Sequence, residues 1–213
     1  MAGISIDPAT LPHRERYKLL TGLVIPRPIA FVTSMSPAGV INAAPFSFFN
    51  LLSDEPTVCV LGIDPRPTGG PKDTSSNILS GREYVVNLVD EAFGPKMNLA
   101  ATDFPPGESE VDAVGLTLAP SVKVKVPRLA EAPVSLECTL REAVPLGPDH
   151  YAILGNVLYL HVREGLVDPT NLRTNLDAYR PLARLSGNYY ASLGPTITME
   201  RLNYAQWKER QDK

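Results

Sequence analysis

The segment at residues 151–162, YAILGNVLYLHV, is apolar at nearly every position. Successive side chains of a strand point to opposite faces, so a strand of this composition is stable only when both faces are covered. One face can line the interior of a barrel, and the other face then needs a helix or a second subunit. The segment therefore predicts a barrel strand whose outer face is also covered.

Further short strands fit the same architecture. Residues 29–35 are apolar and β-branched, and the turn sequence SPAG separates them from residues 40–41, which predicts a hairpin. Short strands that do not alternate regularly with long helices favour a closed antiparallel barrel over a doubly wound sheet. Periodicity and composition predict the remaining strands at residues 57–63, 84–89, 122–126 and 134–141.

Loops and short helices connect these strands. The loop at residues 64–71, DPRPTGGP, carries three prolines and two glycines and cannot continue the strand before it. Asp73 or Thr74 is the expected N-cap of the short helix that follows. A further helical turn is expected around residues 96–101, and composition predicts a loop at residues 104–110. The chain is therefore expected to be mainly β with short helices.

Composition narrows the class of protein. The chain has 213 residues, of which 44% are hydrophobic and 20% charged, and this favours one globular domain spanning residues 1–213. A net charge of −3 without a basic tract argues against a nucleic-acid partner. The sequence shows no apolar run of membrane-spanning length and no secretory signal, so we expect no membrane association and a cytoplasmic location. Cys59 and Cys138 stand in apolar contexts outside any metal or redox motif, which predicts buried structural thiols.

Common catalytic and nucleotide-binding motifs are missing from the sequence. It contains no G-x-G-x-x-G after a strand, no G-x-x-x-x-G-K-[ST], no G-x-S-x-G and no H-E-x-x-H. His13, His150 and His161 are scattered, and we expect His161 to be a structural histidine. If the protein is an enzyme, a cofactor is therefore expected to carry the chemistry.

A polar cluster at Lys72, Asp73 and Thr74 lies where the proline-rich and glycine-rich loop meets the expected helix. Backbone N–H groups and the positive end of the helix dipole would face outward there, beside a cation. The cluster therefore predicts a phosphate-binding cradle. The alternative is an ordinary N-cap with a solvated lysine.

Two further clusters precede this one. In NAAPFSFFN, Ala43, Ala44 and Pro45 permit close backbone approach, Asn42 and Ser47 offer polar contacts, and Phe48 or Phe49 can flank a ring. The alternative is an edge strand whose aromatic residues belong to the core. Thr33 and Ser34 end a strand before a turn, where their hydroxyls are either phosphate ligands or ordinary strand residues.

The order of these blocks resembles a known family. The segment RPIAFVTSMSPAGVINAAPFSFFNLLSDEP, followed by KDTSSNI, VPRLAEAPVSLEC and RLSGNYYA, is similar to the flavin reductase-like FMN-binding split-barrel proteins, which include flavoredoxin. The likeness covers residues 17–190 and leaves residues 191–213 as a C-terminal tail. It implies a six-stranded antiparallel split β-barrel, a homodimer, and FMN near the subunit interface.

The resemblance also implies a set of FMN contacts. Relatives often carry Gly-Glu-Val in the long late strand, whereas this chain has Gly155, Asn156 and Val157, so a carboxylate contact there is in doubt. The segment at residues 184–190 either reaches the neighbouring subunit's flavin or covers its own barrel. Carried over by motif, the FMN contacts are Thr33, Ser34, Asn42, Ala43, Pro45, Ser47, Phe48, Lys72, Asp73, Thr74 and Asn77.

Three functions follow as hypotheses. The first is an NAD(P)H-dependent flavin reductase, in which NADH or NADPH gives hydride to FMN without a catalytic side chain. Reduced flavin then leaves for a partner monooxygenase, or its electrons pass to a bound acceptor. The second is an FMN-binding electron carrier without efficient nicotinamide turnover. The third is a non-redox ligand-binding or interaction barrel whose polar clusters are only caps and turns.

Overall fold

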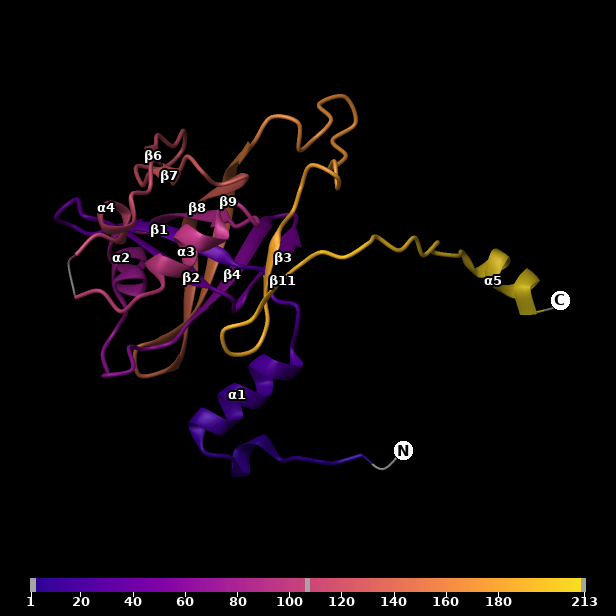
Figure 1. Cartoon of the computed structure of the whole chain (residues 1–213), viewed down its shortest axis with the longest axis horizontal. Coiled ribbons are helices and arrows are strands. Elements are labelled where there is room, and N and C mark those ends of the chain that lie inside the picture. The colour runs from indigo at the N-terminus through magenta and orange to yellow at the C-terminus, as the bar shows by residue number, and fades with distance from the viewer. Residues whose placement is uncertain (1–2, 106–107, 212–213) are drawn as a thin grey trace.

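The computed structural model describes residues 3–105 and 108–211, and most of its ordered elements are strands. Figure 1 shows the strands gathered in one body, from which both ends of the chain project. The helices are η1 (Pro8–Thr10), α1 (His13–Leu23), α2 (Asp73–Gly81), α3 (Gly94–Ala100), α4 (Glu110–Val114) and α5 (Tyr204–Gln211). The strands are β1 (Ala30–Met35), β2 (Ile41–Phe46), β3 (Phe49–Asp54), β4 (Thr57–Ile63), β5 (Glu83–Leu88), β6 (Leu118–Ala119), β7 (Arg128–Leu129), β8 (Val134–Gly147), β9 (His150–Val162), β10 (Leu182–Arg184) and β11 (Tyr190–Ser192).

The main sheet has seven antiparallel strands in the order β2-β1-β5-β8-β9-β4-β3. It curls until β2, at one end, comes into contact with β4 near the other end, and the Gly62 N–H of β4 extends the β3–β4 ladder by donating to the Phe48 carbonyl at 2.7 Å. The two end strands, β2 and β3, follow each other along the chain but do not pair, so the barrel stays split. The expected split-barrel fold is confirmed, with one strand more than the six expected.

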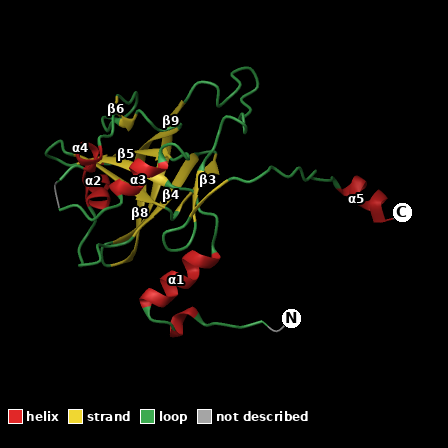
Figure 2. Ribbon diagram, viewed as in Figure 1, coloured by secondary structure: helices red, strands yellow, loops and turns green. Residues whose placement is uncertain are grey.

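Strand β1 is buried on both faces and links two hydrophobic cores. Ala30 and Val32 point into the barrel interior, where they join Tyr84, Leu61 and other residues of the main core. Phe31 points outward into a second core, which is formed by side chains of α3, α4 and the segments around them. Figure 2 shows α2, α3 and α4 together on one side of the sheet. The second core fixes these helices against β1 and β2, where the polar clusters lie.

The interior of the barrel also holds both cysteines. Cys59 and Cys138 are fully buried, with their Sγ atoms 3.9 Å apart, and the Tyr84 hydroxyl lies 3.6 Å from the Cys59 Sγ. Strands β4 and β8 flank β9, so the two backbones are about 10 Å apart, too far for a disulfide. A Cβ atom added at Gly155 would lie 1.8 Å from the Tyr84 hydroxyl, so this position requires glycine. The prediction of buried structural thiols is confirmed.

The prediction of a strand at residues 122–126 is wrong. The carboxylate of Glu137, on β8, accepts hydrogen bonds from the backbone N–H groups of Val122 (2.7 Å), Lys123 (2.5 Å) and Val124 (3.2 Å). The backbone bends so that these three N–H groups reach one buried anion. They are then not available to pair with a neighbouring strand, although the side chains alternate as in a strand. The His161 Nε2 lies 2.6 Å from the same carboxylate, which confirms a structural histidine.

Several element boundaries also differ from the expectation. Helix α2 follows Lys72, which is the N-cap and makes no side-chain capping bond, so neither Asp73 nor Thr74 is the cap. Strand β8 continues to Gly147, beyond the predicted end at residue 141. The expected loop at residues 104–110 gives way to α4 at Glu110, and its residues 106–107 lie outside the described residues. The other predicted strands and the helical turn near residue 96 are confirmed.

Two segments project from the barrel, and apolar side chains remain exposed. Helix α1 buries only Thr21, and α5 buries no residue at the end of an extended arm (Figure 1). In the C-terminal half of β9, the side chains of Leu158 and Leu160 are 44% and 57% exposed, and Leu51 and Leu52 are exposed on the edge strand β3. No helix in the described part of the chain is long and apolar enough to cross a membrane.

Candidate functional site

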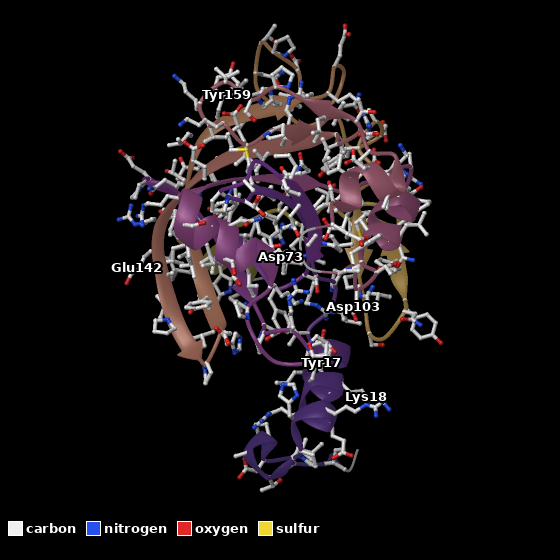
Figure 3. All side chains as sticks on the ribbon, turned by 90° about the vertical axis from the view of Figure 1, so that its left-hand side faces the viewer. Tyr17, Lys18, Asp73, Asp103, Glu142 and Tyr159 are labelled. Carbon is white, nitrogen blue, oxygen red and sulfur yellow. The ribbon has the colours of Figure 1, made fainter. Side chains whose placement is uncertain are left out.

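A cavity of about 350 Å³ lies where β2, the start of α2 and the segments around α3 and α4 meet. A second cavity of about 170 Å³ adjoins it, and the two share Pro45, Phe46, Lys72 and Ala101. We call the two together the trough. Figure 3 shows this side of the molecule, with Asp73 near the centre, Asp103 below it and Tyr17 of α1 lower still.

The polar end of the trough is built on the start of α2. The loop before it brings in Lys72 with an extended backbone, and the first N–H groups of the helix have no acceptor within the helix. The Lys72 Nζ lies 5.4 Å from the centre of the Phe46 ring and forms no ion pair with any described residue. Arg66 pairs with Asp73 at 2.8 Å. This end therefore offers orphan donors, a helix dipole and an unpaired cation, which suit a phosphate group.

A hydrogen-bond network joins Asn42, Thr74 and Glu110 behind these donors. In the amide orientation that satisfies every partner, the Asn42 nitrogen donates to Glu110 Oε1 at 3.2 Å and its oxygen accepts from the Thr74 hydroxyl at 2.9 Å. The other oxygen of Glu110 accepts from the Ala43 N–H at 2.9 Å. The network fixes the main chain of β2 against the start of α2.

Glu110 is an ionisable group within this wall. Burial raises its pKa above the ordinary value, and the backbone N–H bonds from Ala43 and from Glu110 itself offset only part of that effect. No lysine or arginine forms an ion pair with it among the described residues. Its carboxylate therefore loses hydration without gaining a cation.

The second cavity has aromatic walls. Phe48 is 40% exposed, and its ring centre lies 6.2 Å from that of Tyr17 on α1. The same cavity is lined by Arg184, whose guanidinium lies 4.6 Å over the Tyr190 ring, and the Tyr190 hydroxyl donates to Asn98 Oδ1 at 3.0 Å. These rings line a space that suits a flat aromatic ligand. The segment at residues 184–190 lies against its own barrel at this cavity.

Not every residue of the expected FMN set reaches the trough. Ser34 accepts a hydrogen bond from the Asn77 amide at 3.1 Å, and both side chains are buried. The Thr33 hydroxyl donates to the Pro127 carbonyl at 2.7 Å. Ala43 is fully buried and offers only its main chain. The residues that line the trough are Asn42, Pro45, Ser47, Phe48, Lys72, Asp73 and Thr74.

Sequence reasoning missed two contributors to this region. Arg27 is only 7% exposed and its Nε donates to the Ser47 hydroxyl at 3.3 Å. Its place between two prolines in an apolar stretch was the available signal, because a charged residue there needs partners. Glu110 gave no local signal, because only tertiary packing brings it to β2.

The trough can bind but holds no evident catalytic side chain. No group of three or more His, Cys, Asp or Glu side chains that could hold a metal occurs in residues 3–105 and 108–211. The trough walls carry no cysteine, and no histidine lies beside a hydroxyl nucleophile there. Its phosphate-competent end and its aromatic end together suit a phosphorylated ligand with a flat ring, the chemical class to which FMN belongs.

Comparison with known proteins gives a consistent picture. The family model described as "flavin reductase like domain" matches residues 22–190. An uncharacterized protein of Halalkalibacterium halodurans is 41% identical over 97% of this chain and 100% of its own length.

Two solved structures are similar over almost their whole lengths. Nitrilotriacetate monooxygenase component B from Bacillus cereus is 37% identical, with a TM-score of 0.88, covering 93% of this chain and 100% of that one. The 2-nitrobenzoate 2-nitroreductase of Pseudomonas fluorescens is 35% identical, with a TM-score of 0.87, covering 94% of this chain and 98% of that one.

Proposed function

The chain belongs to the flavin reductase-like domain family, and on that premise we propose that it is an NAD(P)H-dependent FMN reductase. The observation that carries the proposal is the trough, in which an unpaired cation at a helix N-terminus adjoins a cavity with aromatic walls. When bound, FMN supplies the hydride and electron transfer that no side chain of the trough provides.

The residues of the trough would bind and orient the cofactor. Lys72 and the first N–H groups of α2 would hold the phosphate, and each charge-assisted contact is worth about 1.5–3 kcal/mol. Phe48 would lie against the flat ring, while Asn42 and Ser47 offer hydrogen bonds to polar edges. A phosphate-specific end favours FMN over riboflavin.

The fate of the electrons divides the proposal into two versions. One similar structure is component B of a monooxygenase, which supports transfer of reduced flavin to a second protein component. The other is a nitroreductase, which supports transfer to a small acceptor bound at the trough. An FMN-binding electron carrier without efficient nicotinamide turnover is the alternative to both versions.

We further propose that the working unit is a homodimer. Leu158 and Leu160 of β9 and Leu51 and Leu52 of β3 are between 44% and 60% exposed, more apolar surface than a monomer usually leaves in water. A two-fold interface would cover such strands. Light scattering across a dilution series should give twice the chain mass, and a monomer at micromolar concentration with FMN fully bound would refute the dimer.

The experiment that tests the activity is a visible spectrum of the purified protein followed by rapid mixing with NADH and with NADPH. A flavin absorbance that bleaches within seconds supports the reductase. A stable yellow chromophore that neither donor bleaches supports the electron carrier. Failure of the purified protein to bind added FMN would contradict both the reductase and the electron carrier.

A further inference from the structure

Arg27 is a buried cation without a carboxylate partner among the described residues. Its guanidinium instead donates to three carbonyls, at Thr21 (2.5 Å), Val24 (2.7 Å) and Leu185 (2.8 Å). Two of these carbonyls belong to the last turn of α1, where the helix dipole favours a cation. Burying a guanidinium is costly unless its donors are paired, and these three carbonyls pair most of them.

The remaining contact of the guanidinium is directed at the trough. The Arg27 Nε–H donates to the Ser47 Oγ at 3.3 Å, and Ser47 lines the second cavity. A serine hydroxyl has one proton to donate. Because Ser47 accepts from Arg27 and donates to no described residue, its proton is available to a ligand in the second cavity.

The backbone of Arg27 is also hydrogen-bonded to Arg184, which lines the second cavity. Its N–H donates to the Arg184 carbonyl at 3.1 Å, and the Arg184 N–H donates back to the Arg27 carbonyl at 2.9 Å. The side chain of Arg184 lies over Tyr190 in the second cavity. Arg27 thus connects α1, Ser47 and the segment at residues 184–190 through hydrogen bonds.

We propose that Arg27 is a positioning residue that fixes Ser47 as a hydrogen-bond donor to an acceptor on the edge of the bound flavin ring. The inference rests on the proposed function and deepens it by assigning one polar contact and its support. Arg27 itself makes no contact with the ligand.

The test is a double-mutant cycle on FMN affinity, measured by titrating FMN into apoprotein. Arg27→Lys retains the charge and can still reach a carbonyl, but it lacks the Nε donor to Ser47. Arg27→Lys and Ser47→Ala should each lower the affinity for FMN by fivefold or more. The double variant should lie within twofold of Ser47→Ala alone, because both changes remove the same contact. Arg141→Gln, on the exposed face of β8, is the matched control and should leave affinity unchanged.

The reduction potential of the bound flavin distinguishes positioning through Ser47 from a merely structural role of Arg27. Positioning through Ser47 predicts a shift of the same direction and size in Arg27→Lys and in Ser47→Ala, whereas loosened packing would leave the potential unchanged. Unchanged FMN affinity in Arg27→Lys, or losses that multiply in the double variant, would overturn the inference. Failure of the wild type to bind FMN would instead overturn the proposed function.

Should Arg27→Lys not fold, the wild type itself decides the question. The Arg27 side-chain Nε–H is buried and is observable by NMR with labelled arginine. Its resonance should shift when FMN binds to the wild type and should shift much less in Ser47→Ala. An Nε–H signal that FMN leaves unmoved would contradict the proposed link between Arg27 and Ser47.

Discussion

Glu137 and Glu110 are both buried, yet their surroundings act on them in opposite ways. Burial raises the pKa of Glu137, but bonds from His161 and from the N–H groups of Val122, Lys123 and Val124 outweigh it, so the net shift is downward. Burial also raises the pKa of Glu110, where backbone N–H bonds do not compensate, and the net shift is upward. One carboxylate is saturated with donors, and the other is not.

The difference separates a structural region from a binding region. Glu137 holds the segment at residues 121–126 against β8 and takes no part in either cavity. Glu110 lines the first cavity, close to the start of α2 where we place the phosphate. A fully satisfied buried anion stabilises a fold, whereas an incompletely satisfied one marks a place where a ligand can change the electrostatic balance.

The largest expected effect is on stability at Glu137. Glu137→Gln removes the charge that four donors share, and breaking such a buried arrangement should lower the free energy of unfolding by roughly 3 kcal/mol. Urea denaturation at pH 7 measures the change. Glu142→Gln, an exposed change on the same strand (Figure 3), should stay within about 0.5 kcal/mol of the wild type. A loss equally small at Glu137 would end the distinction between the two carboxylates.

The pH dependence of stability sharpens the comparison. The folded-state pKa of Glu137 lies below its ordinary value of 4.5, so its contribution is complete above that pH and is lost as the pH falls through the folded pKa. Wild-type stability should therefore fall more steeply than that of Glu137→Gln between pH 5 and pH 3. Parallel curves in urea titrations at several pH values would contradict the assignment.

Glu110 should behave in the opposite sense and with a smaller effect. Its folded-state pKa is raised, so it opposes folding once the pH exceeds the unfolded pKa, and Glu110→Gln removes that penalty. The variant should be as stable as the wild type at pH 7, or up to about 1 kcal/mol more stable. It should also bind FMN two- to fivefold more tightly, because a negative charge near the phosphate is gone. Weaker FMN binding with an intact fold would show that Glu110 serves the ligand as an acceptor.

Local patterns predicted most of the fold. The apolar run of residues 151–162 predicts β9, and the turn residues SPAG predict the pairing of β1 with β2; both signals are short-range properties of the sequence. The VKVKV segment alternates as a strand does, but Glu137 captures its N–H groups from another strand, and no local pattern encodes that contact.

The candidate site was predictable to a similar extent. Lys72 and Ser47 stand in motifs at chain turns, and both line the trough. Ser34 and Asn77 belong to the same motifs, yet they hydrogen-bond to each other in the interior. Motif position alone does not state which side chain faces a cavity, because that depends on the packing of α2 on β1.

The central claim is that the trough binds FMN through a phosphate held at the start of α2. The direct test is to titrate apoprotein with FMN and with riboflavin, in the wild type, in Lys72→Ala with Thr74→Ala, and in Lys18→Ala, whose side chain points away from the barrel (Figure 3). The wild type should bind FMN at least tenfold more tightly than riboflavin. The Lys72 and Thr74 double variant should weaken FMN by at least tenfold while riboflavin binding changes little, and Lys18→Ala should match the wild type. Equal affinity of the wild type for FMN and riboflavin would contradict the account.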